Sequence, residues 1–494
     1  MSYLLLILGV GLAGFMLLIL GALTALAPDL VVRLMPVILV GVVMLSAGFV
    51  RTGTVNRRFV GFWLVAIIVT ATLWPSYVSV RLGGLPSIDL RKVVFGLSVL
   101  VLLYLAVAQP LISSAWRELT PGAKWLAWCV LIYGLLRMVS ALGSPVPIAA
   151  FLAVTWEWVY YYVPFFIALL LMRDAQSRHI FVRSIYLLIL VVVAFAIYER
   201  FVGANPLVRW ASVSGGAQEL VAALNLSRVR DGVFRAQATF EHPLLLAEFA
   251  AVAAAFTFGQ FLNGAASSAR VLGLAGFLVA VVAAVLSGSR IALVSLVIVV
   301  VTVLLSTGVR ARGARKVSAA IATRLFVLLS ILVIAAASLP LLQGLFEGRT
   351  TTEASSSSAR LQMLKSGIPA MLEEPFFGKG YGEAVFEAGV QGTGGLLTLD
   401  NYLLTVGIDS GVPALLIFVA IFIVPAWMAF KRVTDAAGEE QGFLISALAA
   451  LVGLLAVRLI LSIPYNLVFA FVIAALVAGA IPKKQVLNGK SSEQ

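Results

Sequence analysis

Long apolar segments alternate with short polar ones along the whole chain. A helix needs about 20 apolar residues to cross the hydrocarbon core of a bilayer, and about fourteen segments approach or exceed that length. We therefore predict an all-α polytopic membrane protein. The predicted spans are 3–26, 34–50, 60–79, 93–112, 125–142, 158–172, 184–202, 241–262, 271–287, 291–309, 324–343, 402–430, 442–461 and 465–481.

Composition supports this fold class. Of the 494 residues, 62% are hydrophobic and only 12% are charged, about half the charged share of a soluble domain. The chain is too poor in charge to cover soluble cores, which excludes a soluble enzyme and a disordered chain. The single cysteine, Cys129, and the two histidines exclude a disulfide framework and a cysteine-based or histidine-rich metal centre. We expect no cofactor.

Charge asymmetry predicts the orientation. The net charge is +13, and basic residues concentrate in loops on the cytoplasmic side of membrane proteins. Both termini are therefore predicted to be cytoplasmic. One loop is an exception, because Arg81, Arg91 and Lys92 fall on the opposite side. The basic stretches that set the orientation are 51–58, 173–183, 310–324, 431–432 and 483–490.

Two long loops, 203–240 and 344–401, are predicted to face the outside, the second between the eleventh and twelfth spans. Long ordered loops are often functional. The serines at 355–358 and the glycines at 392–395 suit a flexible tether, whereas 361–375 has the apolar spacing of an amphipathic helix on the outer membrane surface. We divide the chain into an N-terminal bundle (1–230), a catalytic region with the large loop (231–430), and C-terminal helices (431–494).

Ionisable residues cluster at the outer ends of the spans, where they often indicate function. Arg235 precedes Glu241 and His242, and Pro243 is suited to the first turn of a helix. Helix capping and a boundary arginine are the simpler explanation for this segment. Glu248 follows within the span and is either deep in the site or the partner of an arginine.

Four further cations are candidates for substrate binding. Arg290 follows a Ser-Gly-Ser turn, and Arg360 opens the loop helix that precedes Lys379. Snorkelling or solvation explains these three equally well. Arg458, inside an apolar span, needs a carboxylate, a carbonyl or an anionic ligand.

Asp400 and Asn401 end the large loop, where either residue can cap the next helix. Asp409 lies on a different face from Asp400, because nine residues make two and a half helical turns.

This set of residues suggests glycosyl transfer from a lipid-linked diphosphate. We predict that Arg235, Arg290 and Arg360 converge on one outward cavity, because guanidinium groups grip phosphate with paired hydrogen bonds. A carboxylate can accept the proton of a sugar hydroxyl. No Asp-x-Asp pair occurs in an outer loop, which favours a metal-independent mechanism.

The sequence resembles the O-antigen ligase and polymerase superfamily of bacterial inner-membrane glycosyltransferases (the Wzy/WaaL type). The resemblance covers about 230–425. It rests on Arg235 with Glu241-His242-Pro243, the Ser-Gly-Ser-Arg290 turn, Arg360 in a large loop with Glu-Glu-Pro-Phe-Phe-Gly-Lys-Gly-Tyr-Gly at 373–382, and Asp400-Asn401-Tyr402-Leu403.

The resemblance implies a periplasmic active site and an undecaprenyl-diphosphate-linked glycan as donor and acceptor, without nucleic acid. Membrane lipid and a chain-length regulator are further expected partners. Ligases carry a histidine where this chain has Asp400, which favours a polymerase of O-antigen or exopolysaccharide units over a ligase. A lipid-linked glycan transporter is the alternative of another class, but its polar groups would extend through the membrane depth. The predicted base is Asp400, then Glu241 or His242, and the predicted substrate-binding residues are Arg235, Arg290, Arg360, Lys379, Asn401 and Arg458.

Overall fold

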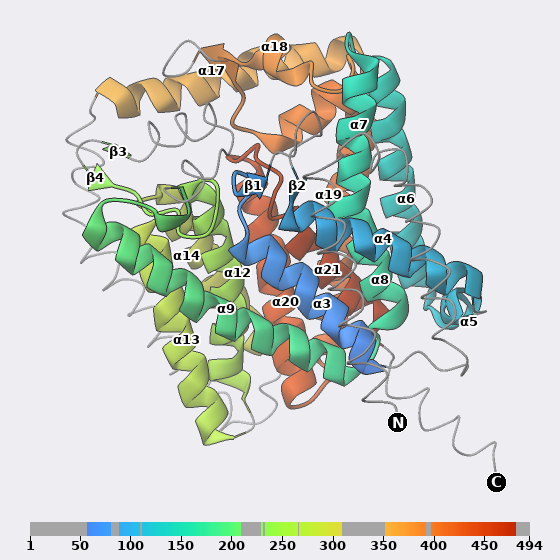
Figure 1. Ribbon diagram of the computed structural model, residues 1–494, viewed down its shortest axis with the longest axis vertical. Helices are drawn as coiled ribbons and strands as arrows, with labels where there is room; N and C mark the ends of the chain where they lie inside the picture. Colours follow the sequence, from blue (N-terminus) through green and yellow to red (C-terminus); the bar gives the residue numbers. More distant parts are fainter. Residues whose placement is uncertain are drawn as a thin grey trace, which may run out of the picture.

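The computed structural model describes residues 57–80, 88–108, 111–208, 229–230, 233–264, 266–308, 351–391 and 397–480. Within these residues the chain forms fifteen α-helices, one π-helical turn and three two-stranded antiparallel ribbons. The ribbons pair β1 with β2, β3 with β4 and β5 with β6. The described part of the protein is therefore an almost entirely helical bundle (Figure 1).

The elements before residue 210 supply one half of the bundle. They are α3 (Arg57–Leu73), β1 (Ser79–Val80), β2 (Ile88–Asp89), α4 (Leu90–Ala108), α5 (Leu111–Glu118), α6 (Pro121–Leu142), α7 (Pro147–Glu157), the π-helical η1 (Trp158–Tyr162), α8 (Val163–Leu171) and α9 (Ala175–Val202).

The remaining elements supply the other half and a cap at one end. They are β3 (Val229–Arg230), β4 (Val233–Phe234), α12 (Pro243–Asn263), α13 (Ser267–Leu286), α14 (Arg290–Gly308), α17 (Thr351–Glu373), α18 (Ala384–Ala388), β5 (Val390–Gln391), β6 (Leu397–Thr398), α19 (Tyr402–Val433), α20 (Glu439–Arg458) and α21 (Leu467–Gly479).

Eight helical segments of the described chain are long and apolar enough to cross a membrane. Two shorter apolar helices, Trp63–Leu73 and Leu467–Gly479, fall inside predicted spans. The predicted spans 3–26, 34–50 and 324–343 lie outside the described residues, so the total of fourteen stays a prediction. The eight segments are 121–142, 147–170, 175–202, 243–263, 267–286, 290–307, 402–433 and 439–458.

One span begins earlier than its hydropathy indicated. The sequence predicted 158–172, but the helix starts at Pro147 and continues through η1 into α8. The charged Glu157 interrupts the apolar run in the sequence, and in the fold it is buried in an ion pair with Arg137. A paired carboxylate can occupy a helix interior that an unpaired one would disrupt.

Helix α12 lies at the centre of its half of the bundle. It packs against α13, α14 and α20, and its alanine-rich sequence is buried on almost every side. A helix that is apolar all round belongs in an interior, and small side chains let its neighbours approach closely. The N-terminal half joins the C-terminal one where α6 packs against α19.

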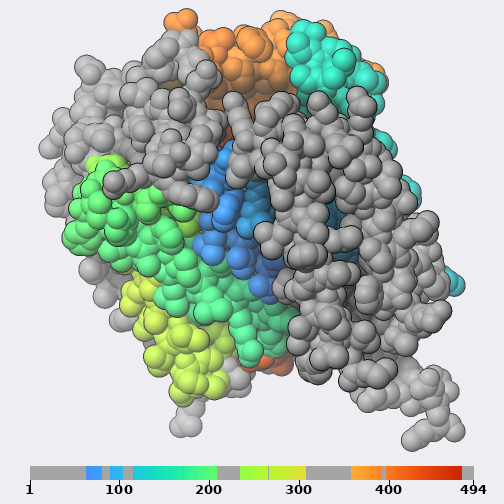
Figure 2. Space-filling view, viewed as in Figure 1, coloured from blue at the N-terminus to red at the C-terminus, as the bar shows by residue number. Residues whose placement is uncertain are grey.

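The described part of the large loop, 351–391 and 397–401, is mostly helical. Helices α17 and α18 lie across one end of the bundle, and the turn between α6 and α7 reaches the same end (Figure 1; Figure 2). The predicted amphipathic helix exists and starts at Thr351, so the serines at 355–358 are helical and do not form a tether. The glycine-rich segment 392–396 lies outside the described residues.

Helix α17 packs on the bundle through one set of residues and exposes another. Met363 and Ala370 pack with Leu404 and Ile408 of α19, whereas Leu361, Leu364 and Ile368, which belong to the predicted apolar face, are exposed. The helix is held by its small and flexible residues. Its larger apolar residues point away from the bundle, and their predicted contact with the membrane surface stays a prediction.

Helix α19 breaks at Gly411, whose φ of 83° and ψ of 169° are not helical. The chain after α17 packs into this break. A Cβ on Gly411 would lie 2.5 Å from the Phe376 carbonyl oxygen, and one on Gly378 would lie 2.5 Å from the backbone of Asp409. Both positions have positive φ, so the contact between the two backbones requires glycine on each side.

The predicted topology can be tested by cysteine accessibility, because Cys129 is the only cysteine and is buried. In a Cys129→Ala background, Lys365→Cys in α17 should react with a membrane-impermeant maleimide applied to spheroplasts. Asp435→Cys, between α19 and α20, should react only after permeabilisation, because the single helix α19 separates the two ends. Protection of Lys365→Cys in intact spheroplasts would overturn the predicted orientation.

Candidate functional site

Most of the predicted site residues lie at or next to helix termini. Arg235, Glu241 and His242 lead into the start of α12, and Arg290 begins α14. Asp400 and Asn401 lead into the start of α19, and Arg458 ends α20. Helix termini therefore bring together residues that are more than 200 positions apart in the sequence.

The segment 235–242 is fixed by contacts along its backbone. The buried carboxylate of Glu199, near the end of α9, accepts hydrogen bonds from the backbone N–H groups of Gln237 and Ala238 at 2.9 and 2.7 Å. Asn205 donates to the Ala238 carbonyl at 2.6 Å. Sequence reasoning missed Glu199, whose position at the end of an apolar span was the available signal.

Arg235 lies against the turn that precedes α14. Its Nε donates to the Ser287 carbonyl at 3.2 Å. A Cβ on Gly288, which has φ of 57°, would approach the Arg235 Cγ to 2.9 Å. Arg290 follows this turn directly and its side chain is exposed. The structure thus places Arg235 against the turn that leads into Arg290.

His242 is the N-terminal cap of α12. Its Nδ1 accepts a hydrogen bond from the Leu244 N–H at 3.1 Å. Burial, reinforced by the positive charge of Arg235, lowers the pKa of His242 to about 4. The imidazole is therefore neutral at pH 7, and because Nδ1 is the acceptor, the proton lies on Nε2. This arrangement does not suit His242 to the role of base that the sequence suggested.

Glu241 is buried and already engaged. It accepts hydrogen bonds from the Arg91 guanidinium at 2.9 Å and from the Ser76 N–H at 2.8 Å. Its negative charge is the main reason that the pKa of Tyr465 is raised to about 12, with burial adding to the effect. The capping group of α12 is His242, so Glu241 is not the cap.

Two cations of the loop that departs from the predicted orientation are paired in the fold. Arg91 is a buried partner of Glu241, and Lys92 lies 3.6 Å from Asp89. Arg81 lies outside the described residues.

Arg458 has two protein partners of the predicted kinds, a carboxylate and a carbonyl. It forms a fully buried ion pair with Glu248 and donates to the Ile463 carbonyl at 2.6 Å. Its guanidinium also lies 5.8 Å from the Tyr402 ring centroid. Glu248 is therefore the partner of an arginine, one of its two predicted roles, and the pair closes the interior between α12 and α20.

Asp400 and Asn401 have separate roles. Asn401 caps α19 by accepting the Leu404 N–H at 3.1 Å. The half-buried Asp400 uses its backbone N–H to contact Met363 Sδ, and among the described residues no group donates a hydrogen bond to its carboxylate. Burial raises the pKa of Asp400, and the positive charge of Arg360 opposes that shift.

Arg360 and Lys379 differ in how they are engaged. The Nε of Arg360 is buried and has no hydrogen-bond partner within the described chain. Lys379 Nζ lies 2.6 Å from Glu373 and 2.8 Å from Glu387, and these carboxylates, Glu373 first, raise its pKa. Lys379 therefore bridges two carboxylates of its own loop.

A buried charge network that sequence reasoning missed surrounds Arg137. Its guanidinium contacts both carboxylate oxygens of Glu157, with Nη2 to Oε1 at 2.8 Å and Nε to Oε2 at 3.2 Å. It also reaches Asp409 at 3.5 Å and Ser410 at 3.0 Å, and it lies 4.5 Å from the Tyr381 ring centroid. The available signal in the sequence was an arginine inside the apolar segment 125–142.

The network attaches the large loop to the bundle. Backbone N–H groups of Lys379 and Gly380 donate to the carbonyls of Ile408 and Asp409 at 2.8 and 3.2 Å. These carbonyls precede the break in α19, so the loop replaces intrahelical donors that the break removes. The first turns of α19, which follow Asp400, are consequently fixed by the loop.

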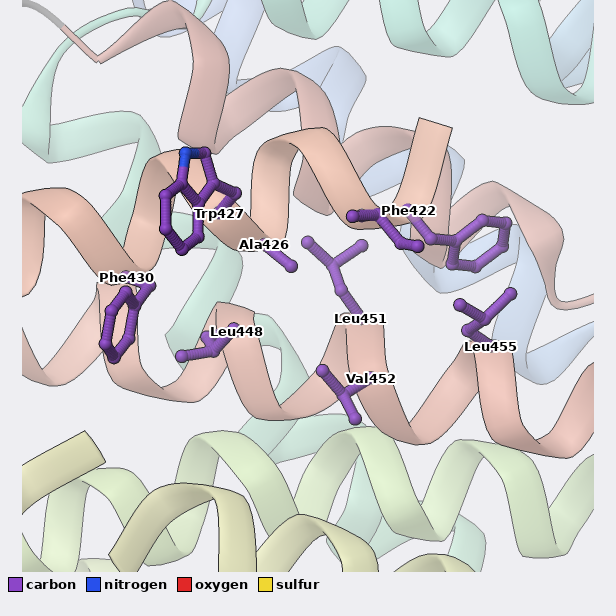
Figure 3. Close-up of a pocket in the computed structure, with 9 residues that line it drawn as sticks. Phe422, Ala426, Trp427, Phe430, Leu448, Leu451, Val452 and Leu455 are labelled. Atoms are coloured by element: carbon purple, nitrogen blue, oxygen red, sulfur yellow. The ribbon is translucent and has the colours of Figure 1, made fainter. Parts of the chain in front are cut away.

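A groove between α19 and α20 has no polar chemistry. It is lined by apolar side chains and by Trp427, as Figure 3 shows. A charged diphosphate has no partner there. The polar end of the bundle remains the candidate site.

The three arginines that were predicted to converge lie in two separate groups of neighbouring residues. Arg235 lies beside the Arg290 turn and His242, and Arg360 lies beside Asp400. That both pairs line one cavity stays a prediction.

We expect Arg137→Met to lower the melting temperature of the purified protein markedly, because it leaves Glu157 and Asp409 buried without their cation. Breaking a buried pair costs about 3–5 kcal/mol. Fluorescence-monitored thermal unfolding in detergent measures the change. Adding Glu157→Gln and Asp409→Asn, which remove the charges and keep the acceptors, should restore part of the loss. An Arg137→Met protein as stable as wild type would contradict the anchoring role.

Comparison with known proteins finds a family match for the region that contains the large loop. Residues 275–419 match a family model described as O-antigen ligase. The match includes Arg290, Arg360 and Asp400 and ends within α19. No curated protein matches the chain.

Proposed function

Because residues 275–419 carry a domain of the O-antigen ligase family, whose members are glycosyltransferase-like membrane enzymes, we propose that this protein polymerises lipid-linked oligosaccharide repeat units. The transfer takes place at the outer face of the bacterial inner membrane. One observation carries the proposal: Asp400 is a half-buried carboxylate beside Arg360, and no described residue donates a hydrogen bond to it.

The other predicted bases are engaged elsewhere. Glu241 accepts hydrogen bonds from Arg91 and a backbone N–H, Glu248 is fully buried against Arg458, and His242 uses its lone pair to cap α12. A general base needs a free lone pair within reach of the proton that it accepts. Asp400 satisfies this condition.

The environment of Asp400 suits a base. A raised pKa increases the affinity of a carboxylate for the proton of a sugar hydroxyl, and the ideal value approaches the working pH. Burial raises the pKa of Asp400, and the positive charge of Arg360 opposes that rise.

The proposed reaction is a displacement at the anomeric carbon of the donor glycan. The acceptor hydroxyl oxygen forms the new bond to this carbon, its proton passes to Asp400, and the bond to the diphosphate oxygen breaks. The diphosphate leaves on its lipid with additional negative charge. Arg235 and Arg290 stabilise that charge, which is the role of preorganised cations in such transition states.

Several predicted substrate contacts are not part of this proposal. Arg458 and Lys379 are paired with carboxylates of the protein, and the Asn401 side chain caps α19. Arg235, Arg290 and Arg360 remain the proposed contacts to diphosphate and glycan. Membrane lipid and a chain-length regulator remain proposed partners.

A ligase that transfers the glycan to a lipid A core is the second candidate. The description of the matched family favours it, whereas Asp400, at the position where the resemblance places a ligase histidine, favours the polymerase. The location of the candidate residues at one end of the bundle favours an enzyme over a transporter.

We expect Asp400→Asn to reduce polymer formation by about 10²–10⁴-fold, the usual loss on removing a general base. The change keeps the size of the side chain, and Asn401 still caps α19. Carrier-linked glycan from a deletion strain complemented with each variant gives the readout: single repeat units indicate a polymerase defect, and full-length polymer retained on the carrier indicates a ligase. Asp435→Asn, in an exposed turn, is the matched control. Wild-type polymer from Asp400→Asn would refute the assignment of the base.

We expect Arg360→Gln to move the acidic limb of the pH–rate profile to higher pH. Arg360 holds the pKa of Asp400 down, so removing its charge raises that pKa and protonates the base at a higher pH. Arg360→Lys keeps the charge and should shift the limb less. The pH dependence of transfer in proteoliposomes tests this, and an unmoved limb in Arg360→Gln would show that Asp400 does not set it.

A further inference from the structure

The tautomer of His242 is fixed by the fold. Nδ1 accepts the Leu244 N–H at 3.1 Å, and a ring nitrogen that accepts a hydrogen bond carries no proton. The proton of the neutral ring is therefore on Nε2, the nitrogen at the far end of the imidazole. The half-buried ring presents this N–H as a donor, and within the described part of the chain no acceptor engages it.

The neighbourhood of the ring favours an anion. Arg235 is close enough for its charge to act on the imidazole, and its Nε contacts the carbonyl of the turn that leads to Arg290. The adjacent carboxylate of Glu241 is engaged by Arg91 and Ser76. A neutral donor beside the Arg235 cation complements phosphate oxygens and adds no charge repulsion.

We propose that His242 is a substrate-contacting hydrogen-bond donor, whose Nε2–H binds a diphosphate oxygen of the lipid-linked donor between Arg235 and Arg290. This role rests on the proposed function and replaces the role of base. His242 takes up no proton during the reaction. It adds a hydrogen bond of fixed direction to a site where guanidinium groups supply the charge.

Two substitutions separate the functions of the two ring nitrogens. Asn has an oxygen near the position of Nδ1, so His242→Asn keeps the cap and loses the donor at the distance of Nε2. Gln has an amide nitrogen near the position of Nε2, so His242→Gln keeps the donor and loses the cap. We therefore expect His242→Asn to retain stability and lose diphosphate affinity. We expect His242→Gln to retain diphosphate affinity and lose stability.

The binding probe is farnesyl diphosphate, added to the full-length protein in detergent and measured by calorimetry. His242→Asn should bind it about 10- to 100-fold more weakly than wild type, the range for a hydrogen bond to a charged group. His242→Gln should bind within a few-fold of wild type and melt at a lower temperature. Wild-type affinity in His242→Asn would show that His242 is only a cap.

The kinetics separate a donor from a base. Neither Asn nor Gln accepts a proton, so a base would lose about 10²–10⁴-fold in kcat in both variants. If His242 is a hydrogen-bond donor, kcat falls mainly in the His242→Asn variant. Equal, large losses of kcat in both variants, with farnesyl diphosphate binding intact, would overturn the proposal.

Nitrogen-15 NMR gives a test that does not depend on activity. The chain has only two histidines, and the other one, His179, forms a contact with Glu439. In a His179→Gln variant, all histidine signals therefore come from His242. We expect the Nε2–H tautomer, no titration between pH 5 and 8, and a shift of the Nε2 signal with farnesyl diphosphate. An Nδ1–H tautomer or a titration near pH 6.5 would refute the inference, whereas absence of glycan transfer by wild-type protein would refute the proposed function.

Discussion

The contact on which the described structure most depends is the guanidinium of Arg137 between the carboxylates of Glu157 and Asp409. Charges taken out of water are costly unless they are paired and hydrogen-bonded, so these three groups can be buried only together. They come from α6, from the helix that continues into η1, and from α19. Their association fixes the path of the large loop and therefore the place where Asp400 enters α19.

Buried charges elsewhere follow the same principle, which separates structural ions from candidate catalytic ones. Arg91 is neutralised by Glu241, and Arg458 by Glu248. These pairs occupy two of the carboxylates that the sequence offered as candidates. Among the predicted bases, Asp400 has a carboxylate to which no described residue donates a hydrogen bond, and that carboxylate remains available for a substrate.

The sequence predicted the helices well because lipid imposes one simple requirement on every span, a long apolar run. It also indicated that Arg458 needs a carboxylate or a carbonyl. It did not identify Glu248 as its actual partner, 210 positions away, because pairing at that separation depends on how helices pack. For the same reason the sequence missed Arg137 and left Asp400 and Asn401 equally able to cap α19.

The break at Gly411 has a consequence for how this region can be exchanged between related proteins. The segment after α17 donates backbone hydrogen bonds to Ile408 and Asp409 and accepts one from Val412 through the Pro375 carbonyl. Loop and helix thus share one hydrogen-bonding ladder across the break, although the sequence separates them. A chimera joined at the apparent loop end, before Tyr402, would divide this ladder between two parents. A chimera that takes α17 through Gly411 from one parent keeps the ladder whole, which places its junction inside α19.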